Sequence, residues 1–94
     1  MAHQLRSYRV KPGQMQPFLE VFDRVVEARR AHGFTVDGVW YSDADNVFTW
    51  VVSHDGPFEE AVERYYESDE RKAITPSPVS FLDEVETHMV QRHL

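Results

Sequence analysis

The residue types in this chain that are best suited to chemistry are one histidine and one arginine. His54 lies where a predicted strand meets a predicted helix, and an imidazole titrates in the range that a general base needs. As a base it could deprotonate a phenol and let the resulting anion react with oxygen. The sequence favours a structural role instead, in which His54 bonds the backbone of the Asp55-Gly56 turn.

Arg71 follows the second predicted helix, where it could hold a carboxylate or enolate oxygen by a two-pronged contact. A solvated ion pair with Glu67, four residues earlier, is worth about 0.3–0.5 kcal/mol on a helix and is the favoured alternative. Arg6, Arg9 and Arg64 are the other charged candidates. If the protein is an enzyme, we expect His54 to be its base and Arg71 to hold the developing anion.

Aromatic side chains could line a flat pocket for an aromatic or hydrophobic ligand, because binding pockets are mostly apolar with few polar groups. The four candidates for contact with such a ligand are Tyr8, Trp40, Trp50 and Tyr66. Core filling is the alternative, since truncating a buried Phe or Trp to Ala costs about 3–5 kcal/mol. It is favoured for Phe48 and Tyr65. Both interpretations stay open for the tryptophans, whose indole N–H groups need a partner when buried.

The residues give little support for thiol, metal or haem chemistry. The chain has no cysteine, which excludes a disulfide, a thiolate nucleophile and a thiolate metal site. No histidine pair has metal-ligand spacing on one element, so we expect no metal. Haem would need a histidine aimed into a pocket, and the spacing of His54 and His88 does not indicate one. We therefore expect no cofactor.

Length and charge limit the class of protein. We expect one domain over residues 1–94, which buries only about 60–70% of the surface of its unfolded chain. The net charge of -6, from 10 Lys and Arg against 16 Asp and Glu, argues against binding of nucleic acid, which requires a basic stripe on the protein.

No apolar run approaches the roughly 20 residues that span a bilayer, and no signal peptide is visible. We expect a cytoplasmic protein.

The hydrophobic pattern predicts two strand–helix–strand units. Strands are expected over 4–10, 34–42, 47–54 and 81–91, and helices over 15–31 and from residue 57 to about 66, with a short helical continuation over 68–73. Simple alternation in the second strand would place Val36, Gly38 and Trp40 on one face. Together these elements predict an α+β, ferredoxin-like βαββαβ fold with a four-stranded antiparallel sheet.

Two helices can cover only one face of such a sheet. The strand over 47–54 is nevertheless apolar on both faces, with Phe48 and Trp50 on one and Val47 and Val51 on the other. A strand that is covered on both sides has this pattern. Since most soluble oligomers are symmetric, we expect a homodimer whose sheets pack face to face.

Three segments together resemble one known family. The sequence Arg6-Ser7-Tyr8-Arg9-Val10-Lys11-Pro12-Gly13 is similar to the opening of NIPSNAP-like domains. Gly38-Val39-Trp40, then Asn46 and Phe48-Thr49-Trp50-Val51, resemble the central hairpin of that family, and Tyr65-Tyr66-Glu67-Ser68-Asp69-Glu70-Arg71 its second helix and the turn that follows. The resemblance extends from Arg6 to about Val90.

This resemblance implies a dimeric α/β barrel. The wider superfamily includes cofactor-free monooxygenases of polyketide quinols, haem-degrading enzymes, chlorite dismutase-like proteins and stress-response barrels, so the fold alone does not select a function. Two classes of function stay open. The first is a ligand-binding protein that acts as a cofactor-independent monooxygenase or isomerase. The second is a non-enzymatic module that binds a ligand or another protein. Haem binding is a weaker third.

Overall fold

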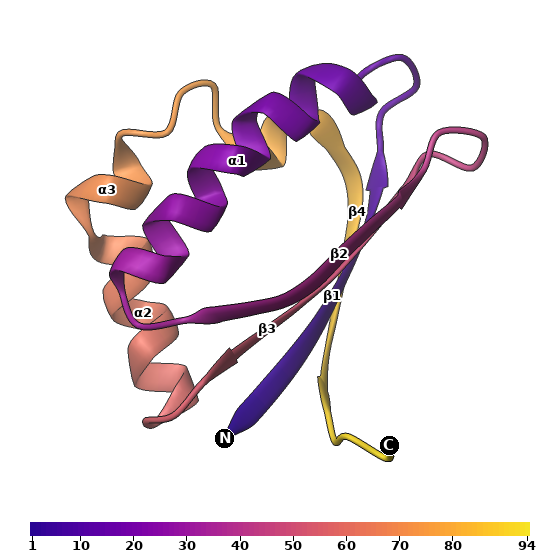
Figure 1. The fold of residues 1–94 in the computed structure, drawn as a ribbon. Helices are drawn as coiled ribbons and strands as arrows, with labels where there is room; N and C mark the ends of the chain where they lie inside the picture. Colours follow the sequence, from indigo (N-terminus) through magenta and orange to yellow (C-terminus); the bar gives the residue numbers. More distant parts are fainter.

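The chain folds in the predicted order, and the computed structural model describes all residues from 1 to 94 (Figure 1). The strands are β1 (Ala2–Val10), β2 (Thr35–Ser42), β3 (Val47–His54) and β4 (Leu82–Val90). The helices are α1 (Met15–Ala31), α2 (Phe58–Glu67) and the short α3 (Asp69–Lys72), and η1 (Pro78–Phe81) is a 3₁₀ turn. Phe81 belongs to this turn, so the last strand begins one residue later than predicted.

The four strands form one antiparallel sheet in the order β2-β3-β1-β4. The helices α1, α2 and α3 lie on one face of this sheet, and the other face carries no helix (Figure 1). The predicted α+β, ferredoxin-like architecture is therefore confirmed. We call the face toward the helices the inner face and the opposite one the outer face.

Local chemistry sets the ends of α1. The turn before it contains Gly13 and the turn after it Gly33, with φ of +78° and +82°. These left-handed conformations suit glycine because a Cβ would crowd the following carbonyl. The α1 boundaries agree with the predicted range of 15–31.

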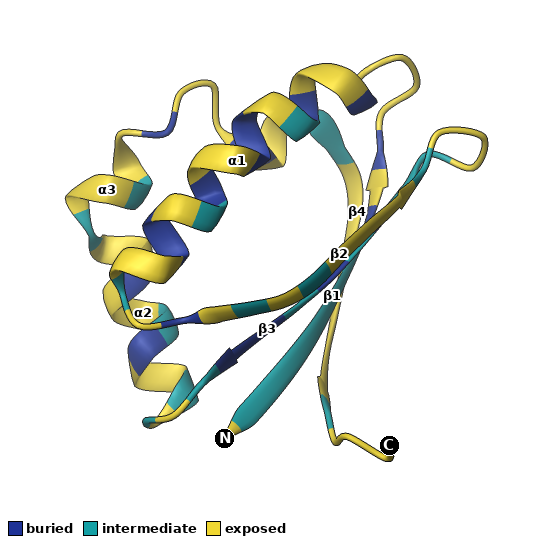
Figure 2. Cartoon of the chain, viewed as in Figure 1, coloured by how far each residue is buried: buried dark blue, intermediate teal, exposed yellow.

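The core lies between α1 and the middle of the sheet. Phe48, Trp50 and Val52 on β3 and Phe18 on α1 are fully enclosed. Figure 2 shows the same pattern, with the buried residues of α1 turned toward the sheet. Because β3 and β1 occupy the centre of the sheet, their inner-face side chains form the floor beneath the helices.

A bulge in β2 changes which side chains share a face. Val36 pairs with Val52, but the register shifts at Asp37, and Trp40 then pairs with Thr49. Directly paired residues point to the same face, so Val36 lies on the inner face and Trp40 on the outer one. The prediction that Val36 and Trp40 share a face is therefore wrong, because one extra residue in a strand reverses the alternation beyond it.

None of the helices combines the length and the apolar character that a membrane crossing requires.

Candidate functional site

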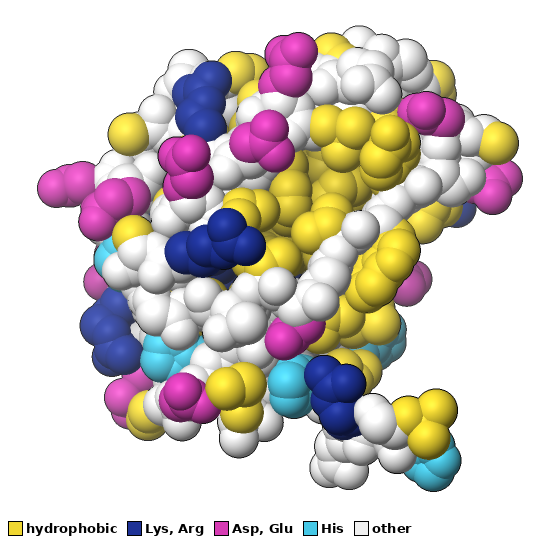
Figure 3. All heavy atoms as spheres, in the orientation of Figure 1, with side chains coloured by type: hydrophobic (Ala, Val, Ile, Leu, Met, Phe, Trp, Pro, Cys, Tyr) yellow, Lys and Arg dark blue, Asp and Glu magenta, His cyan; other side chains and the backbone are white.

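A cavity opens between the inner face of the sheet and the helices. It is lined mainly by hydrophobic side chains, and its volume is about 40 Å³. In Figure 3 hydrophobic side chains form the floor of a hollow in this view, with basic side-chain atoms beside it.

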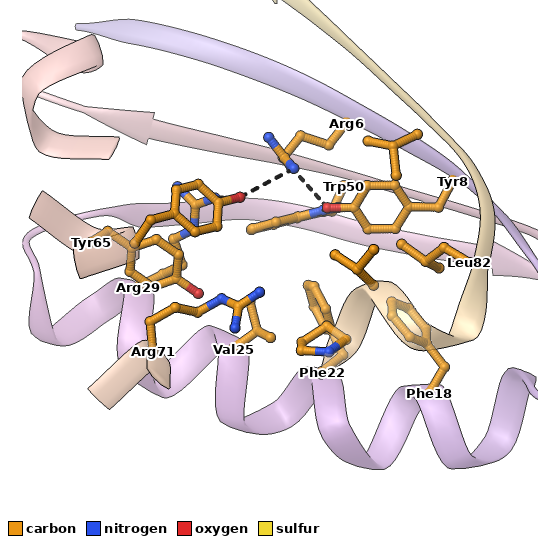
Figure 4. Close-up of a pocket in the computed structure, with 14 residues that line it drawn as sticks. Arg6, Tyr8, Phe18, Phe22, Val25, Arg29, Trp50, Tyr65, Arg71 and Leu82 are labelled. Atoms are coloured by element: carbon orange, nitrogen blue, oxygen red, sulfur yellow. Dashed lines mark hydrogen bonds between the residues drawn. The ribbon is translucent and has the colours of Figure 1, made fainter. Parts of the chain in front are cut away.

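Helix α1 forms one wall through residues spaced at helical intervals. Phe18, Phe22, Val25 and Arg29 follow one another at steps of four, three and four, and all four line the cavity. Such steps place side chains on one helix face. The wall is apolar at the Phe18 end and basic at the Arg29 end (Figure 4).

Arg29 is not among the site residues predicted from the sequence. With Arg30 it forms a basic pair in the last turn of α1. The signal was nevertheless present, because Arg29 continues the apolar stripe four residues after Val25. A charged residue in register with a core stripe is a candidate for a buried functional group.

The sheet forms the opposite wall through Arg6, Tyr8 and Trp50. The Trp50 Nε1–H donates to the Tyr8 hydroxyl at 2.9 Å, and Arg6 Nε–H donates to the same oxygen at 2.8 Å. Arg6 also donates to Gln4 Oε1 at 3.0 Å. The buried indole thus has the partner that it needs, and Tyr8 joins β1 to β3 at the cavity floor.

Arg29 is 1% exposed, and its guanidinium has no carboxylate partner. Its Nε and one terminal nitrogen have no hydrogen-bond partner, and the other makes a long contact of 3.5 Å with the Tyr66 hydroxyl. The guanidinium instead lies over the Tyr65 ring, 4.1 Å from its centroid. Burial lowers the pKa of Arg29, and the nearby charge of Arg6 acts in the same direction.

Tyr65 and Tyr66 close the basic end of the cavity from α2. The Tyr65 hydroxyl is buried without a partner, and burial raises the pKa of this phenol. Tyr66 is partly exposed, and its hydroxyl accepts a long contact of 3.4 Å from Arg6. For Arg6, burial acts to lower the pKa, but the Tyr8 and Tyr66 hydroxyls outweigh it, so the pKa is raised.

Arg71 reaches the cavity from α3, as Figure 4 shows. Ser68 caps this turn by accepting from the Arg71 backbone N–H at 3.1 Å. The guanidinium lies 5.5 Å from the centroid of the Tyr66 ring. No ion pair with Glu67 forms, although the sequence favoured one. The arginine is therefore available to a ligand.

The structure does not bring all the predicted site residues together. Tyr8, Trp50, Tyr66 and Arg71 line the cavity. His54 does not, and its Nδ1 accepts from the Gly56 backbone N–H at 2.8 Å. This is the structural role that the sequence favoured for it. Trp40 lies on the outer face and is 59% exposed.

A family model described as NIPSNAP matches residues 3–87 of this chain. The chain belongs to the NIPSNAP family. The match includes every cavity residue discussed above, and it confirms the resemblance drawn from the sequence. No curated protein shows a significant match to this NIPSNAP chain.

Solved structures show the same fold. A NIPSNAP domain protein from Burkholderia xenovorans superposes with a TM-score of 0.83 at 22% identity, covering 98% of this chain and 94% of that one. A NIPSNAP family protein from Agrobacterium tumefaciens gives a TM-score of 0.81 at 19% identity, covering 96% and 86%. A structure described as an antibiotic biosynthesis monooxygenase gives 0.76 at 12% identity, covering 98% of each chain. These similarities show the fold of the NIPSNAP chain. Its chemistry has to be inferred from the residues of the site.

Proposed function

We propose that this NIPSNAP domain binds a small aromatic or hydrophobic molecule in the cavity between the sheet and α1. One observation carries the proposal. The cavity has mostly hydrophobic walls, with a small number of polar groups converging at one end. That combination is typical of sites that bury a ligand and fix its orientation.

Native mass spectrometry of the protein purified without added ligand tests this proposal. We expect extra mass on the folded chain that dissociates on unfolding. Val85→Trp should remove it, because Val85 is 45% exposed and lines the cavity, so an indole there obstructs it. Met89→Trp is the matched control on the same strand and the same inner face, 56% exposed and outside the cavity lining. Equal retention of the mass by both variants would contradict the cavity as the site.

Cofactor-independent oxidation or isomerisation of the bound molecule is the second candidate. It is supported by the shared fold with the protein described as an antibiotic biosynthesis monooxygenase and by Arg71 beside the cavity. A fixed guanidinium can stabilise an anion that develops on a substrate. Under this hypothesis turnover depends on Arg71 and not on His54, which lies outside the cavity lining.

The enzymatic and non-enzymatic hypotheses differ in the fate of the bound molecule. An enzyme converts it and consumes oxygen or releases an isomer, whereas a binding module returns it unchanged. Turnover that is lost in His54→Ala while the domain stays folded would overturn the assignment of the chemistry to the cavity. Loss in Arg71→Met with the fold intact would support it.

We also propose that the protein is a homodimer that pairs through the outer face. Leu5, Val47 and Val51 lie on this face with Trp40, and no helix covers them. The Ser7 and Thr49 hydroxyls are hydrogen-bonded to each other among these side chains, at 3.2 Å, and ion pairs of His3 with Asp37 and of Arg9 with Glu84 border them. A second copy would supply an identical face of matching size.

A further inference from the structure

We infer that the cavity ligand is an aromatic carboxylic acid with a single ring, whose carboxylate lies against Arg29, Arg71 and the tyrosine hydroxyls. This inference rests on the proposed binding function and adds the chemical class of the ligand. It follows from a count of hydrogen-bond donors and acceptors at the basic end of the cavity, from the charges there, and from the size of the cavity.

The cavity carries positive charge without any negative charge. Arg6, Arg29 and Arg71 line it, and no Asp or Glu does. This is unexpected in a chain with 16 acidic residues against 10 basic ones. None of the three arginines takes part in an ion pair. Buried charges in proteins are usually paired, so an anionic ligand would complement this site.

The tyrosine hydroxyls have protons to donate and little capacity to accept. A hydroxyl has one proton and two acceptor positions. The Tyr8 oxygen already accepts from Trp50 and Arg6, at 2.9 and 2.8 Å. The Tyr66 oxygen accepts two long contacts from Arg6 and Arg29, at 3.4 and 3.5 Å. The proton of each hydroxyl therefore remains for another group.

Two deeply buried residues of the cavity wall also have unpaired donors. Arg29 is 1% exposed, and its Nε and one terminal nitrogen lack a partner. The Tyr65 hydroxyl, in a side chain that is also 1% exposed, has none either. An arginine has five N–H donors and no acceptor. The unpaired Arg29 N–H groups can be satisfied only by acceptors, and an ionised carboxylate supplies two oxygens that can accept from them and from the Tyr65 hydroxyl.

The remaining walls define the other end of the ligand. Beyond the arginines the cavity is bounded by Phe18, Phe22 and Leu82, as Figure 4 shows. Such a wall receives an aromatic ring rather than a second polar group. The cavity itself has a volume of only about 40 Å³, which excludes a fused polyketide and suits at most one ring that extends into the mouth. A bare inorganic anion would leave the apolar end empty.

Isothermal titration with matched probes tests the inference. The acids are benzoate, phenylacetate, 3-phenylpropanoate and cinnamate, each paired with its neutral primary amide of nearly equal shape. We expect at least one acid to bind at least about tenfold more tightly than its amide, because charge-assisted hydrogen bonds are roughly twice as strong as neutral ones. Inorganic phosphate should bind more weakly than that acid.

Three variants connect that preference to the cavity. Arg71→Met should weaken acid binding about tenfold or more and leave amide binding unchanged, since it removes a charged donor. Tyr65→Phe, which keeps the ring, should weaken the acid alone by a smaller factor. Arg64→Met is the matched control, because Arg64 lies on α2 outside the cavity and pairs with Glu60. It should change neither affinity.

Each other outcome overturns a defined part of the argument. Equal affinity for acids and amides would overturn the anionic ligand and leave the binding function standing. Phosphate binding as tightly as every acid would overturn the aromatic part of the assignment. No binding of any probe at millimolar concentration to the folded protein would overturn this inference. If native mass spectrometry also finds no extra mass, the proposed binding function fails with it.

Discussion

At the scale of single residues, the question is what compensates Arg29 for its lost hydration. A buried guanidinium without a counter-ion costs free energy. In the structure the aromatic rings of Phe34, Trp50, Tyr65 and Tyr66 surround it, with centroids 4.1 to 5.6 Å from Cζ. Desolvated cation–π contacts contribute about 2 kcal/mol or more. They replace part of the hydration and leave the N–H groups free to bind a ligand.

Replacing Tyr8 by Phe should destabilise the domain by about 1–3 kcal/mol, the cost of leaving buried donors unpaired. The lost hydroxyl accepts from both Trp50 and Arg6. Urea denaturation followed by far-UV circular dichroism gives the free energy of unfolding. Tyr41→Phe is the control, because Tyr41 is 50% exposed. A Tyr8→Phe effect no larger than that of the control would contradict the role assigned to this hydroxyl.

Because of Tyr65, the stability of the domain should depend on pH in the alkaline range. Burial raises the pKa of Tyr65 above its ordinary value of 10.0. As the pH rises above about 10, Tyr65 in the unfolded chain therefore loses its proton while the folded chain keeps it. The stability from this group is fully present below pH 10 and is lost as the pH rises toward the folded pKa.

Tyr65→Phe should make the fall in stability from pH 8 to pH 11 shallower than in the natural chain. At pH 8 we expect the variant to be unchanged or up to about 1 kcal/mol more stable, because the deleted hydroxyl is buried without a partner. Urea denaturation at both pH values measures the two differences. Parallel losses in the two proteins would show that Tyr65 does not titrate as described.

The face on which a strand residue lies was predictable from the sequence, whereas other features of the site were not. Tyr8 and Trp50 line the cavity because alternation along a regular strand fixes the face. Arg29 was not predicted as a site residue, because two adjacent arginines at the end of a helix suggested that both are solvated. The directions of the His54 and Arg71 side chains depend on the local geometry of turns at the ends of elements. The hydrophobic periodicity of the sequence does not specify that geometry.

At the scale of elements, regular periodicity made the fold predictable. The boundaries of α1 and β3 agree with the predicted ranges, since an apolar stripe or a run of strand-forming residues extends through each of them. The β2 bulge at Asp37 was not predictable in this way, because alternation carries no signal of an inserted residue. Its consequence is that Trp40 moves from the cavity face to the outer face.

The turn after α1 gives a prediction that separates backbone strain from crowding. Gly33 and Gly13 both have positive φ, so alanine at either position should cost about 1–2 kcal/mol in backbone strain. A Cβ on Gly33 would also lie 3.2 Å from His54 Nε2, whereas one on Gly13 meets nothing within 4 Å. Gly33→Ala should therefore be the more destabilising change in thermal and urea unfolding. Equal losses would mean that His54 moves aside at no cost.

At the scale of the whole molecule, the two faces of the sheet have different surroundings. The inner face carries the helices and the cavity, with Trp50 fully enclosed. The outer face carries Leu5, Val51 and Trp40 without any cover within the chain. A small domain with this thin a core gains stability by covering such a face. The proposed dimer would cover the outer face, whereas the cavity lies between the inner face and the helices.

Neighbouring residues of β2 provide the test of that dimer. Trp40 and Tyr41 are 59% and 50% exposed and point to opposite faces. Trp40→Lys should convert a dimer to monomers at micromolar concentration in sedimentation velocity, since a lysine would be buried opposite its own copy. Tyr41→Lys should leave the dimer intact. Each substitution adds one positive charge to a chain of net charge -6, so a difference between them reflects the face and not the overall charge. A natural chain that sediments as a monomer, or equal dissociation of both variants, would overturn pairing through the outer face.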